Sequence, residues 1–312
     1  MDFTDFQTGK DDTGRRLDKV IRIFIPDLPL SNIYQSMRKG LVKVNGKKTK
    51  PDYRIVENDV ISVADILLGH EQKSENTHAD TGSIKIENLI VFENDDILIL
   101  NKPEGINVQK AKKNEISLAQ LVETYYKRTR PCESLSFRPG PLHRLDKMTK
   151  GLVCFSMSLK CAKWFGEQME AHKIKKTYYA TVEGRVEETV KWNDYILKED
   201  ENGDDFHTVK VIDGNTKDIP ADAKECITTI IPLEIFTNTG NVFTRCEFQI
   251  ETGRQHQIRA QSAFHRHPLA GDTAYGATDS ALPFDLCAFM LEFPKNDIGI
   301  PKNIVLTNPF EK

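Results

Sequence analysis

The stretch His143-Arg144-Leu145-Asp146-Lys147-Met148-Thr149-Lys150-Gly151 places one carboxylate directly between basic residues. It follows the turn formers Pro139, Gly140 and Pro141 and precedes the apolar run Leu152-Val153-Cys154-Phe155, which predicts a short loop before a buried strand. A carboxylate held in such a loop would be ionised and oriented, as a nucleophile or base acting on a polyanion requires. A salt-bridged surface turn could have the same residues, so the rest of the chain must decide between these interpretations.

Four more segments accompany this loop, and all five occur in one order along the chain. They are Asn101-Lys102-Pro103-Glu104-Gly105, Lys175-Lys176-Thr177-Tyr178-Tyr179-Ala180-Thr181-Val182-Glu183-Gly184, Thr252-Gly253-Arg254-Gln255-His256-Gln257-Ile258-Arg259 and His267-Pro268-Leu269-Ala270-Gly271-Asp272-Thr273-Ala274-Tyr275-Gly276. In their order along the chain and in their residues, these segments resemble the signature segments of the RluA-type pseudouridine synthases. With the N-terminal region described below, the arrangement is most similar to the subgroup that acts on large-subunit (23S) ribosomal RNA.

The resemblance implies an RNA pseudouridine synthase, an isomerase that breaks the N1–C1′ bond of uridine, rotates the base and joins C5 to C1′. The reaction involves no redox change, so no cofactor is expected. By resemblance, Asp146 is the catalytic carboxylate, which either attacks C1′ or removes the 2′ proton. Arg259 would pair with Asp146 and keep it ionised. Tyr178 would stack on the target base, Arg144 would hold the base out of its helical stack, and Ile258 would line the pocket.

The N-terminal region has the pattern of a small RNA-binding domain. A helix pattern begins at Gly14-Arg15-Arg16, repeats apolar residues at Leu17, Val20, Ile21 and Phe24, and ends at Pro26. Ser31 can cap a second helix that Gly40 ends, and Asn45-Gly46 predicts a tight turn between strands. This order resembles the S4 RNA-binding domain. The resemblance implies phosphate contacts by a set of basic residues, namely Arg38, Lys39, Lys43, Lys47 and Lys48, to which the active-site loop adds Lys147.

The composition describes an ordinary globular protein. Of its 312 residues 39% are hydrophobic and 29% charged, and the net charge is −3. The six cysteines include no C-x-x-C pair, which fits a reducing cytoplasm, and neither a signal peptide nor an apolar run of about 20 residues is present. Three neighbouring histidines, His256, His265 and His267, lack the cysteines or carboxylates that would complete a metal site, so no metal is expected.

The pattern along the chain predicts four parts. Residues 1–13 would be a loose leader, 14–67 an S4-like domain, 68–83 a polar linker and 84–312 the catalytic domain. Helices and strands in the last part alternate irregularly, which favours an α+β fold on a mixed, mainly antiparallel sheet. Residues 187–222 match the family poorly and would form an inserted loop or hairpin that touches RNA. We expect a cytoplasmic monomer whose partner is ribosomal RNA, with no membrane association.

Cys226 stands where the family commonly has alanine, and two further positions depart from the family pattern: Lys150 stands where serine is usual and Gln261 where histidine is usual. Neither removes a proposed catalytic group, but both affect the expected RNA contacts. A non-catalytic RNA-binding or ribosome-assembly factor that retains the fold is the alternative function. A hydrolase that uses Asp146 and His256 is a weaker alternative, because the chain has no nucleophile elbow or ordered triad.

Overall fold

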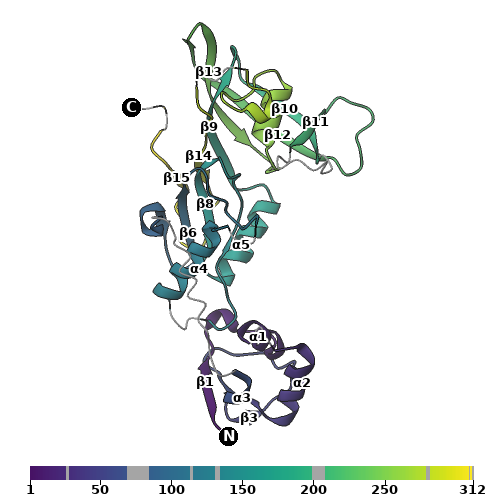
Figure 1. Ribbon diagram of the computed structural model, residues 1–312, viewed down its shortest axis with the longest axis vertical. Coiled ribbons are helices and arrows are strands. Elements are labelled where there is room, and N and C mark those ends of the chain that lie inside the picture. The colour runs from purple at the N-terminus through teal and green to yellow at the C-terminus, as the bar shows by residue number, and fades with distance from the viewer. Residues whose placement is uncertain are drawn as a thin grey trace. The chain divides into compact units, whose positions relative to one another are not determined.

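The computed structural model describes residues 1–25, 28–68, 84–112, 115–130, 134–198, 208–278, 282–308 and 310 (Figure 1). The chain divides into two compact units. The first contains Met1–Asn88, Ala119–Gly140 and Ser156–Ala162, and the second contains Leu89–Leu118, Pro141–Phe155 and Lys163–Lys312. No helix among the described residues is long and apolar enough to cross a membrane. Apart from Leu68, the predicted linker lies outside the described residues.

The first unit contains a four-stranded sheet with the strand order β1-β4-β2-β3, in which all neighbours are antiparallel. Helices α1 and α2 precede the hairpin β2-β3 at one end of this sheet, as the sequence predicted. The elements of this sheet and its helices are β1 Phe3–Gln7, η1 Lys10–Asp12, α1 Leu17–Phe24, α2 Leu30–Lys39, β2 Val42–Val44, β3 Lys47–Lys48, β4 Val60–Ala64 and α3 Asp65–Leu68.

The core of this sheet and its helices follows the helical spacing of the sequence. Leu17, Val20 and Ile21 of α1 are fully buried and pack with Ile33 and Met37 of α2 in one apolar cluster. Burying a side chain of this size contributes about 1.5–3 kcal/mol. The predicted end of α2 is confirmed, because its C-cap adopts the left-handed conformation that glycine tolerates best.

Two predictions for the first unit are wrong. The leader is not loose, because β1 pairs with β4 from Phe3 opposite Ala64 onward. This strand is short and mostly polar, and its contribution to the core is the partly buried Phe6, so its residues show little apolar periodicity. Ser31 does not cap α2, since the helix begins at Leu30 and extended Pro29 occupies the N-cap.

The second unit is organised by an eleven-stranded sheet with the main order β11-β10-β12-β13-β9-β14-β8-β6-β5. Most neighbours are antiparallel, whereas β8 and β14 are parallel, which confirms the predicted α+β class with a mixed, mainly antiparallel sheet. The strands are β5 Ile90–Glu93, β6 Ile97–Lys102, β7 Gly140–Pro141, β8 Lys150–Ser156, β9 Lys175–Glu183, β10 Val190–Lys198, β11 Val209–Asp213, β12 Lys224–Asn238, β13 Asn241–Ile250, β14 Leu286–Glu292 and β15 Asn303–Val305.

The remaining helices connect these strands. Apolar spacing in the sequence predicts helices over residues 116–127 and from Ser158 to His172, and both are confirmed as α4 and α5, whereas α6, which carries Arg259, had no prediction. Their bounds are α4 Leu118–Thr129, α5 Leu159–Glu170 and α6 Gln257–Phe264, with short turns η2 Ile86–Leu89 and η3 Thr273–Tyr275.

Strand β9 occupies an interior position in the sheet. Tyr178 lies opposite Phe248 of β13 on one side and Ala288 of β14 on the other. Side chains alternate along a strand, and Tyr178 and Ala180 share a buried face with Lys176. Backbone pairing on both edges therefore fixes where these side chains point.

The predicted hairpin within 187–222 is present as the antiparallel pair β10 and β11. It is an integral part of the sheet, because β10 also pairs with β12 from Val190 opposite Ile230 to Ile196 opposite Lys224. The residues that join its two strands, 199–207, lie outside the described part of the chain.

Candidate active site

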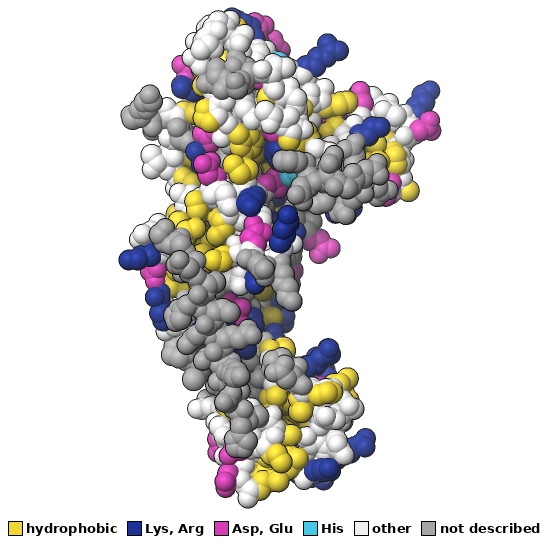
Figure 2. Space-filling model, viewed as in Figure 1, with side chains coloured by type: hydrophobic (Ala, Val, Ile, Leu, Met, Phe, Trp, Pro, Cys, Tyr) yellow, Lys and Arg dark blue, Asp and Glu magenta, His cyan; other side chains and the backbone are white. Residues whose placement is uncertain are grey.

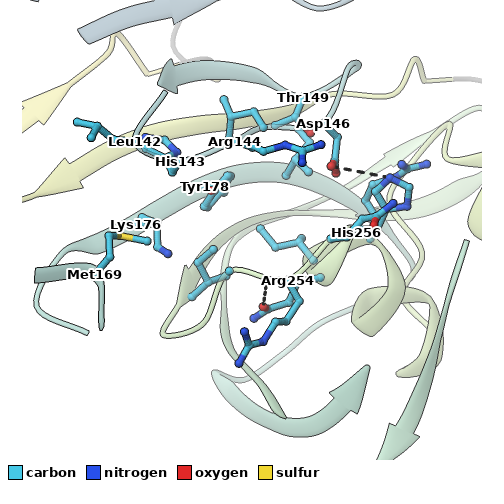
Figure 3. Close-up of a pocket in the computed structure, with 18 of the residues that line it drawn as sticks. Leu142, His143, Arg144, Asp146, Thr149, Met169, Lys176, Tyr178, Arg254 and His256 are labelled. Atoms are coloured by element: carbon cyan, nitrogen blue, oxygen red, sulfur yellow. Dashed lines mark hydrogen bonds and ion pairs between the residues drawn. The ribbon is translucent and has the colours of Figure 1, made fainter. Parts of the chain in front are cut away.

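A pocket of about 500 Å³ opens in the second unit beside the loop between β7 and β8. Its walls come from this loop, from β9 and from the segment that leads into α6. Figure 3 shows Asp146 and His256 together at one end, Lys176 and Met169 toward the other, and Tyr178 between. Asp146 is the one carboxylate among the described lining residues, beside the cationic side chains Arg144, Lys176, Lys198, Arg254 and Arg259.

The loop that carries Asp146 is held by a buried lysine at the end of β6. Lys102 is fully buried. Its ammonium donates hydrogen bonds to the backbone oxygens of Pro103 at 2.9 Å, Ile106 at 2.9 Å and Lys147 at 3.0 Å. Burial lowers the pKa of Lys102 to about 8, although the carboxylates of Asp146 and Glu104 act in the opposite direction. The group is therefore charged at neutral pH and joins the bend after β6 to the residue that follows Asp146.

We expect Lys102→Met to lower the free energy of unfolding by about 2–4 kcal/mol, because it leaves buried carbonyl oxygens without their donor. Urea denaturation followed by circular dichroism measures the loss. Lys110→Met, which removes an exposed lysine of the neighbouring loop, is the control and should change stability by less than about 0.5 kcal/mol. Equal stability of the two variants would contradict the anchoring role of Lys102.

His256 is the nearest basic group to Asp146, with 3.8 Å between Nε2 and a carboxylate oxygen. Its other ring nitrogen, Nδ1, lies 2.9 Å from the hydroxyl of Tyr275. That hydroxyl accepts a hydrogen bond from the Val209 amide, and burial raises the pKa of Tyr275 to about 12, so it remains protonated. A hydroxyl that donates to Nδ1 favours the tautomer with its proton on Nε2, toward Asp146.

Tyr178 lies on the buried face of β9 and lines the pocket with 7% of its surface exposed. Burial raises the pKa of its hydroxyl, and the charge of Asp146 raises it further. The side chain therefore presents a neutral aromatic ring and a protonated hydroxyl between the two ends of the pocket (Figure 3).

The ion-pair partner expected for Arg259 is wrong. Its guanidinium makes two hydrogen bonds of 2.7 Å to the carboxylate of Asp272, a residue that is itself buried. The ring of Tyr275 lies 4.9 Å and that of Phe284 5.4 Å from the guanidinium carbon. Burial acts to lower the pKa of Arg259, but the hydrogen bonds and charge of Asp272, followed by the charge of Asp146, raise it overall. Arg259 thus acts on Asp146 through its electric field, without contact.

The structure brings the other predicted pocket residues to the same site. Ile258 is buried and lines the pocket, and Arg144 lines it with an exposed side chain. Lys147 is exposed, and its ammonium lies 3.1 Å from a carboxylate oxygen of Glu115. The phosphate contact expected of Lys147 therefore has to compete with this surface ion pair.

The five basic residues predicted to contact phosphates lie in adjacent elements of the first unit. Arg38 and Lys39 end α2, Lys43 lies in β2 directly opposite Lys48 of β3, and Lys47 starts β3. Lys43 lies over the Phe3 ring at 4.2 Å. Within the described part of the chain, none of the five forms an ion pair with a carboxylate. Figure 2 shows Lys and Arg side chains spread along one side of this unit.

Each of the three histidines considered as metal ligands has another partner. His256 contacts Tyr275, His265 Nε2 lies 2.9 Å from Asp194, and His267 Nδ1 lies 3.1 Å from the backbone oxygen of Glu183. The described residues contain no group of three or more side chains placed to hold a metal ion.

Comparison with known protein families decides what this site belongs to. A family profile described as RNA pseudouridylate synthase matches residues 96–264, more than half of the chain. The chain belongs to the RNA pseudouridylate synthase family. A second profile, that of the S4 domain, matches residues 15–61, which contain α1, α2 and the basic hairpin. The resemblance recognised in the sequence is thereby confirmed.

Named relatives and a solved structure are also similar to this chain. The chain is 28% identical over 317 residues to "Ribosomal large subunit pseudouridine synthase C" of Vibrio parahaemolyticus, covering 97% of this chain and 93% of that one. The protein of the same name from Haemophilus influenzae is 27% identical, covering 86% and 78%. The solved structure of human RNA Pseudouridylate Synthase Domain Containing 1 shares the fold with a TM-score of 0.57, at 23% identity and with 73% and 86% covered.

The departures from the family pattern at Lys150 and Gln261 have internal partners. Lys150 lies 2.8 Å from the carboxylate of Asp285, so its charge is paired at the start of β8. Gln261 is fully buried, donates to Asp194 at 2.6 Å and accepts from Thr228 at 2.6 Å. Gln261 thus joins α6 to β10 and β12 and is not exposed at the surface.

Several residues of this synthase site were not singled out from the sequence. Asp272 and Lys102 lay inside quoted signature segments, but their partners are distant in sequence or are backbone atoms. From the sequence, His256 is expected to make a structural hydrogen bond; it does contact the Tyr275 hydroxyl, and the fold also places it beside Asp146. Lys176 was quoted only as part of the β9 pattern. The available signal was its spacing of two from Tyr178, which predicts that both side chains share one face.

Proposed function

We propose that this chain isomerises specific uridines of large-subunit ribosomal RNA to pseudouridine, with Asp146 as the catalytic carboxylate. The observation that carries the proposal is the position of Asp146: its side chain is 31% exposed at the pocket, on a loop anchored by Lys102. The names of the relatives, which denote synthases of the large ribosomal subunit, support this choice of RNA.

The pocket offers each group that the isomerisation requires. Asp146 supplies the carboxylate at the ribose, either as a nucleophile toward C1′ or as a base toward the 2′ proton. Tyr178 supplies an aromatic surface and a protonated hydroxyl for the base. Arg144, exposed at the rim, is suited to hold the strand after the uridine has left its stack. The Arg259–Asp272 pair fixes one wall and places a positive charge near Asp146.

Phosphate binding by the basic residues of the first unit, which contains the S4 domain, would provide most of the affinity for RNA. We expect the double variant Lys47→Gln/Lys48→Gln to reduce the slope of log affinity against log salt concentration by about 1.5, because each phosphate contact contributes about 0.7–0.9. Filter binding over a series of salt concentrations measures the slope. Lys10→Gln/Lys85→Gln changes two other exposed lysines of the same unit and is the matched control. The same slope for both double variants would exclude the hairpin as a phosphate-binding surface.

The alternative function is a non-catalytic RNA-binding or ribosome-assembly factor. Both functions predict RNA affinity, so the deciding experiment must follow the base itself. Large-subunit and small-subunit ribosomal RNAs labelled with tritium at uridine C5 are incubated separately with the protein, and tritium released into water is counted. The proposal predicts release from the large-subunit RNA alone. RNA binding without release from either RNA would favour the alternative.

A further inference from the structure

Lys176 is a buried residue whose ammonium reaches the pocket and has no protein partner in the described residues. It lines the pocket, yet only 6% of the residue is exposed. Within that part of the chain, no carboxylate, hydroxyl or carbonyl oxygen forms a hydrogen bond or ion pair with its Nζ. Lys102, which is similarly buried, has three carbonyl acceptors. Because the rest of the side chain is buried, the ammonium is largely desolvated and only the contents of the pocket can supply its acceptors, so the position of Lys176 indicates a ligand there.

The fold fixes Lys176 beside the residue proposed to contact the base. Lys176 and Tyr178 are two positions apart on β9, so both side chains leave the same face about 6.5–7 Å apart. The backbone of Lys176 pairs with Ile250 of β13 and Leu291 of β14. Gly253 approaches the ammonium from another wall, since a Cβ at this position would lie 3.2 Å from Nζ.

This end of the pocket is electropositive. Burial lowers the pKa of Lys176 to about 8, and the nearby charge of Arg254 acts in the same direction. Burial, followed by the charge of Lys176, lowers the pKa of His143 to about 3, so that imidazole is neutral. Figure 3 places Lys176 away from Asp146, with Tyr178 between them. A ligand group that contacts Lys176 would therefore be favoured if it carried negative charge.

The proposed reaction generates such a charge on the base. When the N1–C1′ bond breaks, its electron pair leaves with N1. If Asp146 attacks C1′, a C1′–O bond replaces the broken one. If Asp146 takes the 2′ proton, the C2′–H electron pair forms a C1′=C2′ double bond. Both routes give a detached uracil anion with charge shared by N1, O2 and O4. C5 then supplies the pair that joins it to C1′. In the first route the C1′–O bond breaks and its pair returns to the Asp146 carboxylate; in the second the double-bond pair takes the proton back from Asp146 to C2′. C5 finally loses its proton to solvent, and N1 takes up a proton from solvent.

We propose that the Lys176 ammonium is a further catalytic group, which contacts a carbonyl oxygen of the target uracil and stabilises the anion formed when the base detaches. The inference rests on the proposed function and holds for either role of Asp146. A fixed donor where charge develops lowers the barrier because it needs no reorganisation during the reaction. Backbone phosphates suit the exposed Arg144, Lys198 and Arg254 at the rim better than the buried Lys176.

The test compares Lys176→Met with Lys175→Met in single-turnover tritium release from large-subunit ribosomal RNA. Lys175 precedes Lys176 on β9, but its side chain is exposed and its ammonium pairs with Glu292 at 3.1 Å. Both variants lose one positive charge. We expect Lys176→Met to slow release by about 10²-fold, as for the loss of one donor to a developing oxyanion, with RNA affinity within about threefold of wild type. Lys175→Met should release at the wild-type rate.

A pH series separates the chemical role of Lys176 from a structural one. The ammonium loses its proton above about pH 8, so the wild-type rate should fall there, and Lys176→Arg should move this fall to higher pH because arginine stays charged. An unchanged fall in Lys176→Arg would assign it to another group, such as Lys102, and overturn the inference. The Arg variant also decides the matter if Lys176→Met does not fold.

The other possible results distinguish a failure of the role inferred for Lys176 from a failure of the proposed function. Wild-type kinetics in a folded Lys176→Met, or a defect confined to RNA affinity, would overturn the role of Lys176 and leave the proposed function standing. A wild-type protein that binds RNA but releases no tritium would overturn the proposed function, and this inference with it.

Discussion

Asp146→Asn is expected to slow pseudouridine formation by at least about 10³-fold, because an amide can neither attack C1′ efficiently nor accept the 2′ proton. Its fold and RNA affinity should persist, since the side chain is partly exposed and, among the described residues, its near basic partner is His256 at 3.8 Å. Single-turnover tritium release measures the rate, and filter binding measures the affinity.

The control for Asp146→Asn is Asp218→Asn, which removes the charge of an exposed carboxylate in the second unit. It should release tritium at the wild-type rate. If Asp146→Asn also kept that rate, Asp146 would not be the catalytic carboxylate. If it lost RNA binding to the same extent as activity, the residue would have to be assigned to binding.

Asp272→Asn is expected to lower the free energy of unfolding by about 3–5 kcal/mol, because it leaves the guanidinium of Arg259 largely buried without its counter-charge. Asp272 accepts both hydrogen bonds of this pair and is 2% exposed. Arg259 is the residue after Ile258 on α6, so the loss should also disturb the pocket wall. Urea denaturation of the wild type and the variant measures the difference.

A surface ion pair provides the matched control for Asp272→Asn. Glu292→Gln breaks the pair of Glu292 with the exposed Lys175 and should cost less than about 1 kcal/mol. The double variant Arg259→Met/Asp272→Asn should recover part of the stability lost in Asp272→Asn, because no unpaired charge remains. A double variant that is less stable by the full sum of both single losses would contradict the direct pairing of Arg259 and Asp272.

Much of the fold could be predicted because local patterns there agree with the tertiary structure. The spacing of Leu17, Val20 and Ile21 indicated α1, and Asn45-Gly46 indicated the hairpin, where both residues have the positive φ values that this turn requires, 50° and 74°. Strand β1 lacked such a signal, because its stability comes from pairing with β4, which is more than fifty residues away.

The site was predicted as a set of residues but not as a set of contacts. The signature segments placed Asp146, Tyr178 and Arg259 in one pocket, where the structure also has them. The partner of Arg259 depends on how α6 and the segment after it pack, and thirteen positions of sequence separation do not specify this. Burial likewise distinguishes Lys176 from its neighbour Lys175, although both are lysines of one strand.

The most direct test of the account counts pseudouridine itself. Large-subunit ribosomal RNA from cells that lack this protein is incubated with the wild type or with Asp146→Asn, digested to nucleosides and analysed by chromatography and mass spectrometry. We predict that the wild type adds whole equivalents of pseudouridine per RNA and that Asp146→Asn adds none. No gain with the wild type, or an equal gain with Asp146→Asn, would contradict the account.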